Sequence, residues 1–154
     1  MSQNKGCLFF LLDIFKDKRK EELSYPYEAK EHIMTETELS FYHHLNKLLD
    51  DQHVIFTQVR MEDIIKVKKG IENEFGFRNR IKSRHIDFVI CDAKTGKIQR
   101  AIELNDPTHE RKDRKKRDKF VNQAFSSAGI KLLTMKTQKE YTYEDIENLF
   151  YKKH

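Results

Sequence analysis

Apolar and polar residues alternate along two neighbouring stretches in the second half of the chain. Residues 84–92 and 98–105 are both rich in β-branched and aromatic side chains, a composition typical of strands. The five residues between them include Gly96, which suits the positive-φ position of a hairpin loop. The pattern therefore predicts a β-hairpin.

Each strand of this hairpin carries a carboxylate among apolar neighbours. If the turn is symmetric about Thr95, Asp87 lies opposite Glu103 on one face of the sheet, with the two Cβ atoms roughly 5 Å apart. Two carboxylates at that separation repel each other unless a proton or a cation compensates, and a divalent metal with oxygen ligands is a common solution. The hairpin thus indicates a metal site at Asp87 and Glu103; two simply solvated carboxylates are the alternative.

The remaining elements follow from helical and strand periodicity. Thr35-Glu36-Thr37-Glu38 has the pattern of a capping box, so the first helix is expected to begin at Thr35. The expected order is a helix from Thr35, a strand at about 53–61, the hairpin, a helix at about 113–128 ended by Gly129, a strand at 130–135 and a helix at 143–151. Residues 66–82 are basic, contain two glycines and are expected to be irregular. The order αβββαβα predicts an α/β sandwich around one mixed sheet.

Composition places this sandwich among soluble proteins with a modest core. The 154 residues are 38% hydrophobic and 36% charged, and the net charge of +5 permits an anionic partner. The two cysteines, Cys7 and Cys91, form neither a zinc cluster nor a disulfide framework, which favours a reducing compartment. We therefore expect a cytoplasmic protein.

The N-terminal part of the chain differs from the rest. Residues 7–15 are apolar but shorter than the roughly 20 residues of a membrane span, and no signal-peptide pattern is present. We expect residues 1–30 to be an apolar segment with a charged linker, and residues 31–154 to form the domain. Residues 7–15 are expected to pack on the domain or on a partner protein rather than on a membrane.

Two segments concentrate the positive charge. Seven of the nine residues at 111–119 are Lys or Arg, and residues 66–84 contain seven more, with Phe75 and Phe77 among them. Such runs are commonly solvated surface, but near a metal site they would neutralise phosphates, and interleaved aromatic residues suit single-stranded or distorted nucleic acid. The expected contacts with nucleic acid are Lys82, Arg84, Arg114, Lys115, Lys116 and Arg117.

Two of the charged residues are expected to support the acidic site. Arg117 precedes Phe120 by three residues and Val121 by four, which places it on the core-facing stripe of its helix. An arginine there needs an anionic partner, and Asp118 lies next to it. Gln58, on a strand expected to be central in the sheet, is a further supporting residue.

The combined pattern resembles a known nuclease superfamily. Its parts are a first helix carrying Glu38, Arg-His-Ile-Asp-Phe-Val at 84–89, Ala-Ile-Glu-Leu-Asn-Asp at 101–106, His109, and Arg-Asp at 117–118. These residues and the order of elements resemble the PD-(D/E)xK restriction-endonuclease-like superfamily, and most closely bacterial domains of unknown function related to the very-short-patch-repair endonucleases. The resemblance covers about residues 33–136. It implies a restriction-endonuclease-like sandwich and metal-dependent cleavage of phosphodiester bonds in DNA or RNA.

The resemblance also implies roles for single residues. Asp87 and Glu103 match the metal-binding acids and would hold Mg²⁺ or Mn²⁺, with no small-molecule cofactor. Glu38 matches a first-helix glutamate near the metal, although its capping role could account for it alone. His109 would be a general base or a phosphate contact.

One position departs from the superfamily pattern. Asn105 stands where the pattern has a catalytic lysine, and Lys82 is a candidate for a displaced one. The departure keeps a second interpretation open, in which a catalytically degenerate module of the same fold binds nucleic acid or a partner protein.

Overall fold

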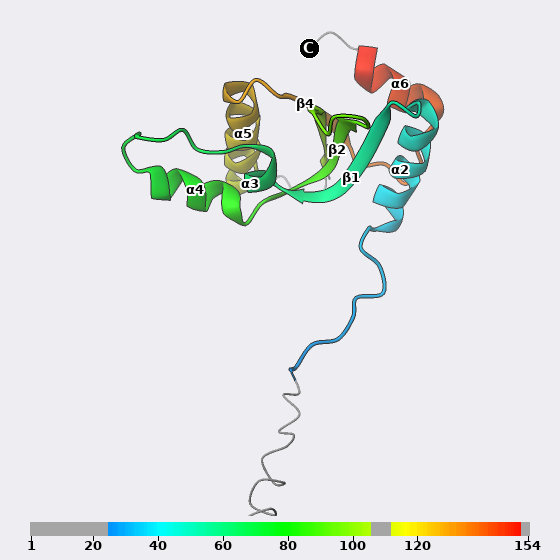
Figure 1. Cartoon of the computed structure of the whole chain (residues 1–154). Helices are drawn as coiled ribbons and strands as arrows, with labels where there is room; N and C mark the ends of the chain where they lie inside the picture. Colours follow the sequence, from blue (N-terminus) through cyan, green and yellow to red (C-terminus); the bar gives the residue numbers. More distant parts are fainter. Residues whose placement is uncertain (1–24, 106–111, 152–154) are drawn as a thin grey trace, which may run out of the picture. The chain divides into compact units, whose positions relative to one another are not determined.

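A four-stranded mixed sheet lies at the centre of the domain in the computed structural model (Figure 1). The structure describes residues 25–105 and 112–151, with the backbone alone for 112–115. The chain divides into two units, Met1–Ile33 and Met34–His154, and the sheet belongs to the second. Residues 7–15 lie outside the described residues.

The sheet combines an antiparallel meander with one parallel strand. The elements are α2 (Glu36–Leu48), β1 (His53–Arg60), α3 (Met61–Ile64), α4 (Glu74–Lys82), β2 (His85–Asp92), β3 (Ile98–Asn105), α5 (Lys112–Ser127), β4 (Lys131–Lys136) and α6 (Tyr143–Tyr151). The strand order is β1-β2-β3-β4, antiparallel except for β4, which runs parallel to β3. The helix α5 lies between β3 and β4 in the chain, as a parallel connection requires. The predicted α/β class and mixed sheet flanked by helices are confirmed.

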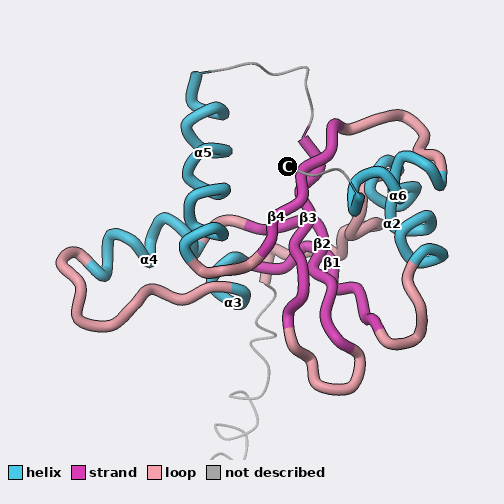
Figure 2. Tube along the Cα trace, turned by 90° about the horizontal axis from the view of Figure 1, so that it is seen from above, coloured by secondary structure: helices cyan, strands magenta, loops and turns pink. Residues whose placement is uncertain are grey.

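Helices cover both faces of the sheet, and each face has its own apolar core (Figure 2). On one side, α3, α4 and α5 pack through buried residues that include Met61, Ile81 and Phe125. On the other side, α2 and α6 pack through Phe41 and Ile146, among others. No helix in the described part of the chain is long and apolar enough to cross a membrane.

The hairpin has the predicted register, but it reaches that register in an unexpected way. Phe88 pairs with Ile102 and Val89 with Ala101, whereas Cys91 pairs with Ile98 because the register shifts after Ile90. The turn is therefore not symmetric about Thr95: the Asp92 carboxylate accepts from the Thr95 N–H at 2.7 Å and from its hydroxyl at 2.6 Å. The irregularity in the pairing restores the predicted register beyond the turn.

The prediction that residues 66–82 are irregular is wrong, because α4 occupies Glu74–Lys82. Asn73 adopts a left-handed backbone with φ of 57°, and its side chain accepts from the Gly76 N–H at 3.2 Å. A Cβ at Gly76 would lie 2.4 Å from Asn73 Oδ1. A side chain at position 76 would therefore displace the Asn73 cap, so Gly76 suits the helix start.

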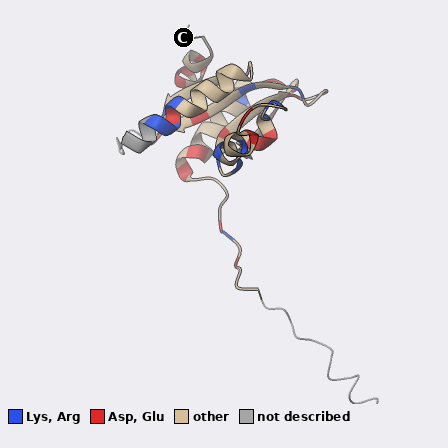
Figure 3. Ribbon diagram, turned by 90° about the vertical axis from the view of Figure 1, so that its left-hand side faces the viewer, with Lys and Arg blue, Asp and Glu red and all other residues tan. Residues whose placement is uncertain are grey.

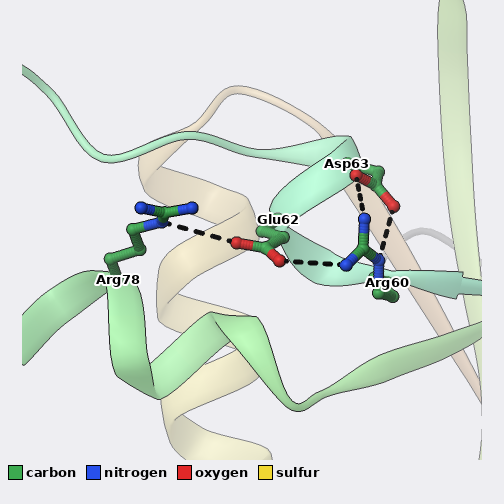
Figure 4. A network of polar contacts seen from close by, with 4 residues as sticks. All are labelled: Arg60, Glu62, Asp63 and Arg78. Atoms are coloured by element: carbon green, nitrogen blue, oxygen red, sulfur yellow. Dashed lines mark hydrogen bonds and ion pairs between the residues drawn. The ribbon is translucent and has the colours of Figure 1, made fainter.

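The helices α3 and α4, which the sequence did not predict, are joined by an ion-pair network (Figure 4). Glu62 pairs with Arg60 at 3.2 Å and with Arg78 at 3.5 Å. The Arg60 guanidinium also donates two hydrogen bonds to Asp63. The side chain of Glu62 is only 14% exposed, so the network links α4 to the end of β1 through a largely shielded carboxylate.

Candidate functional site

Asp87 and Glu103 lie together where β2 and β3 separate. The last backbone pair between β2 and β3 is Phe88 with Ile102. The same register, continued by one residue, places Asp87 opposite Glu103. Asp87 Oδ2 accepts from the Leu104 N–H at 2.7 Å. A side-chain oxygen thus takes the place of a strand carbonyl, which fixes the Asp87 carboxylate between the two strands.

Glu103 is the buried charged residue of this site, with 8% of its surface exposed. Its Oε1 accepts from Arg117 Nη2 at 2.9 Å, whereas its buried Oε2 has no hydrogen-bond partner among the described residues. Burial, reinforced by the charge of Asp87 and opposed by Arg117, raises the pKa of Glu103 to about 7. An unpartnered buried oxygen is costly, so Oε2 is suited to a proton or a bound cation.

Asp87 is also perturbed, and the cause places Glu38 nearby. Burial raises the pKa of Asp87, the Leu104 N–H lowers it, and the charge of Glu38 raises it. Glu38 Oε2 accepts from the Thr35 N–H at 2.7 Å and from the Thr35 hydroxyl at 2.9 Å, which confirms the capping box. The capping role engages Oε2 alone, and Oε1 faces Gln58 instead of the helix start.

Gln58 bridges the acids from a strained position in β1. Its φ is 53°, and the β1–β2 pairing passes from Thr57 to Val59 without it. Its Nε2 donates to Glu38 Oε1 at 2.9 Å, and a hydrogen bond from Gln58 lowers the pKa of Asp87. A non-glycine residue at positive φ costs on the order of 1–3 kcal/mol and is held by its surroundings, often at functional sites.

The expectation that Gln58 lies on a central strand is wrong, since β1 is an edge strand of the described sheet. An edge strand pairs on one side only and tolerates such an irregularity.

The helix α5 supplies the expected partner for the pair. Arg117 donates to Glu103, and the charge of Asp118 contributes to the raised pKa of Glu103. Lys116 is exposed, and the side chains of Arg114 and Lys115 lie outside the described residues. Among the described side chains of α5, Lys and Arg precede an uncharged stretch that begins after Lys119 (Figure 3).

The other predicted residues are not joined to this cluster by a described contact. Asn105 ends β3, half-buried, and its carbonyl accepts from the Thr137 N–H at 2.8 Å. Lys82 is exposed in the last turn of α4, and Arg84 donates to the carbonyl of Arg80. His109 lies outside the described residues.

Sequence reasoning missed Tyr141, which lies beside the acids. It is 4% exposed, and its ring packs edge-on against Phe41 at 5.2 Å between centroids. Burial raises the pKa of Tyr141, and the charges of Asp87 and Glu38 add to the effect. Tyr141 follows β4 in a loop, where neither helical nor strand periodicity marks a residue as buried.

The two carboxylates of the site could hold a hard cation. Asp87 and Glu103 offer carboxylate oxygens, and Glu103 Oε2 is unpartnered among the described residues. No group of three or more His, Cys, Asp and Glu with metal-binding spacing occurs in the part of the chain that the structure describes. Mg²⁺ commonly binds through one or two carboxylates together with substrate phosphates and water, so two acids suffice for such a site.

One protein family matches the part of the chain that contains this site. The family described as "Protein of unknown function (DUF2726)" matches residues 30–153. The chain belongs to this family. The matched range contains the hairpin acids, Gln58 and the basic part of α5, so the site is part of the family domain. No curated protein and no solved structure gives a significant match.

The raised pKa of Glu103 predicts a pH-dependent effect on stability. Between the ordinary pKa of 4.5 and the raised pKa of about 7, the folded protein retains a proton that the unfolded chain releases, so the stability linked to Glu103 is present at acid pH and falls as pH rises through this range. We expect Glu103→Gln to raise the Tm by several degrees at pH 8 without added metal, and by much less at pH 4.5.

Thermal unfolding followed by circular dichroism at the two pH values measures this difference. Glu147→Gln, the same change at an exposed position of α6, is the control and should show no pH-dependent gain. An equal effect of Glu103→Gln at both pH values would contradict the raised pKa.

Proposed function

We propose that the chain is a metal-dependent nuclease that hydrolyses phosphodiester bonds in DNA or RNA. The observation that carries the proposal is the Asp87–Glu103 pair, in which Glu103 is buried and its Oε2 has no hydrogen-bond partner among the described residues. A structural ion pair would satisfy both acids, whereas this pair leaves a negative site that a cation can fill. The resemblance of the sequence to the PD-(D/E)xK superfamily points to the same chemistry.

The arrangement of the elements around the acids also bears on which α/β fold the domain has. An antiparallel hairpin carries both acids, α5 follows it, and β4 returns parallel to β3. This arrangement agrees with the restriction-endonuclease-like sandwich that the resemblance implies. We propose that fold for residues 31–154.

Each residue of the site has a role that follows from its contacts. Asp87 and Glu103 would hold Mg²⁺ or Mn²⁺, which when bound polarises a phosphate and lowers the pKa of a coordinated water. The Leu104 N–H fixes Asp87, while Arg117 fixes one oxygen of Glu103 and leaves the other for the cation.

Proton transfer from the attacking water falls to residues around this pair. Glu38 lies close enough for its charge to act on Asp87, and Gln58 orients it. His109 remains the second candidate through its sequence proximity to Glu103. Either residue would accept the proton of the water as general base.

Strand β4 carries a lysine, Lys136, beside Asn105, the position where the superfamily pattern has its catalytic lysine. Asn105 pairs in parallel register with Lys136 of β4, as Glu103 pairs with Thr134. Register partners in parallel strands share a face, so exposed Lys136 lies on the face of the sheet that carries Glu103. We assign to Lys136 the electrostatic role that Asn105 cannot fill.

The alternative function is binding without catalysis, and Asn105 is the observation that favours it. A module of the same fold would then bind nucleic acid or a partner protein without hydrolysing phosphodiester bonds. The two functions differ in their need for a divalent ion. Incubation of the protein with single- and double-stranded DNA and RNA, in Mg²⁺, Mn²⁺ or EDTA, separates them, because cleavage in the metal arms alone supports the nuclease.

The basic part of α5 is expected to contribute affinity without sequence preference. Replacing Lys115 and Lys116 by Ala should lower the slope of log K against log salt by at most about two, because each lysine neutralises about one phosphate. Filter binding between low and moderate salt measures the slope. An unchanged slope would place nucleic acid away from this end of α5.

A further inference from the structure

A basic arm projects beside α5 on the side of the sheet opposite α2 and α6 (Figures 1 and 2). We define the arm as residues 66–84, which comprise α4 and the segment before it. It carries seven Lys or Arg and only two Glu. Two phenylalanines stand open on it, Phe75 with 76% and Phe77 with 43% of its surface exposed. Large apolar side chains at such exposure, surrounded by cations, indicate a binding surface.

A groove of about 290 Å³ lies between the arm and α5. Its walls are largely apolar and include Val67, Ile71, Phe77 and Phe120. Lys66 and Arg80 lie among the lining residues and bring positive charge to the groove. The volume is near the lower limit of the roughly 300–1,000 Å³ of small-molecule pockets, which suits one flat ring system.

A guanidinium is already stacked on an aromatic ring in the groove, and a second one lies near the same ring. The Arg80 guanidinium lies over the Phe120 ring at 4.0 Å from its centroid, and that of Arg84 lies at 5.5 Å. Guanidinium planes and aromatic rings are both faces on which nucleobases stack. The charge of the arm complements the phosphates that connect such bases.

Helix α5 contributes residues both to the groove and to the acidic site. Phe120 lies three residues after Arg117, about 4.5 Å further along the helix axis, and Arg117 holds Glu103. The arm itself runs directly into β2, which carries Asp87. A strand with one phosphate at the acids therefore has its neighbouring nucleotides beside the groove and the arm.

We propose that the arm and its groove bind unpaired nucleobases of single-stranded DNA or RNA, by stacking on Phe75 and Phe77. The inference deepens the proposed nuclease function, since it names the substrate as nucleic acid that is unpaired next to the cleaved bond. Bases within a duplex are stacked on each other and present no free face to these rings. The arm thus selects the substrate, and the site around Asp87 and Glu103 carries out the hydrolysis.

Binding measured in EDTA tests this assignment separately from catalysis. The probes are a fluorescein-labelled 20-nucleotide DNA, the RNA of the same sequence, the DNA duplex, and a 20-unit oligomer of abasic sites with the same phosphate charge. We expect wild type to bind both single strands more tightly than the duplex and the abasic oligomer. The double variant Phe75→Leu/Phe77→Leu should bind the single strands roughly 5- to 100-fold more weakly, with little change for the abasic oligomer.

Leucine keeps an apolar side chain but removes the aromatic face, so the variant distinguishes base stacking from apolar docking. Phe75→Tyr/Phe77→Tyr should restore the affinity, and Phe56→Leu, at a 50% exposed phenylalanine of β1, should leave it unchanged. Equal binding of the abasic oligomer and the natural strands by wild type would overturn the proposal, as would tighter binding of the duplex. No binding of any probe at low salt would overturn it in favour of a protein partner.

Loss of cleavage with the stacking pattern intact would refute the nuclease alone. Conversely, metal-dependent cleavage without dependence on Phe75 and Phe77 would refute the stacking surface alone. The two proposals therefore fail by different results.

Discussion

Glu103→Gln is expected to abolish metal-stimulated cleavage while nucleic-acid binding stays the same or tightens slightly. The substitution keeps the shape of the side chain and an oxygen for Arg117, but it removes the charge that a divalent cation requires. Loss of residues that merely support a metal ligand costs about 10- to 100-fold, so loss of the ligand charge should lower turnover by at least about 100-fold. One negative charge fewer near a phosphate accounts for the slight gain in binding.

Filter binding and cleavage on the same labelled single strand measure both quantities in one preparation. Glu147→Gln removes an equal charge from the exposed face of α6 and should cleave like wild type. The Tm gain of Glu103→Gln at pH 8 shows independently that the variant is folded. Undiminished cleavage by purified Glu103→Gln would refute the proposed metal-dependent nuclease mechanism.

The sequence predicted the acidic pair because the pair depends on local pairing alone. Once two strands and a short turn are recognised, alternation of side chains and register place Asp87 opposite Glu103. The predicted placement is correct although the turn is not symmetric about Thr95, because the register shift after Ile90 compensates for the asymmetric turn at Asp92. The partnership of Arg117 with an acid was also predicted from helical spacing, although its side chain remains 45% exposed rather than buried against the core.

The parts that the sequence did not predict depend on contacts between distant segments. The left-handed backbone of Gln58 is held by side chains of α2 and β2. Glutamine has no intrinsic preference for this conformation, so the sequence alone does not predict it. Tyr141 is buried by packing against Phe41, about a hundred residues earlier in the chain. For α4 the reason is different: the basic, glycine-containing segment has no clear helical periodicity, and the helix start depends on the fit of the Asn73 cap against Gly76.

Asp87→Asn is expected to weaken Mn²⁺ binding and, at the same time, to stabilise the metal-free protein at pH 8. The cation loses one of its two carboxylates, so its affinity should fall by at least about 10-fold. The charge of Asp87 is the second cause of the raised pKa of Glu103, so removing it lowers that pKa and the cost of ionising Glu103. The Leu104 N–H still has an oxygen to donate to.

Calorimetric titration with Mn²⁺ and thermal unfolding in EDTA measure these two effects, and their opposite signs are what makes the test decisive. A misfolded variant would lose affinity and stability together, whereas a lost ligand lowers affinity and raises stability. Asp51→Asn, the same change in an exposed turn, should alter neither quantity. Equal Mn²⁺ affinity in wild type and Asp87→Asn would remove Asp87 from the metal site, and the burial of Glu103 would then need a proton rather than a cation to compensate it.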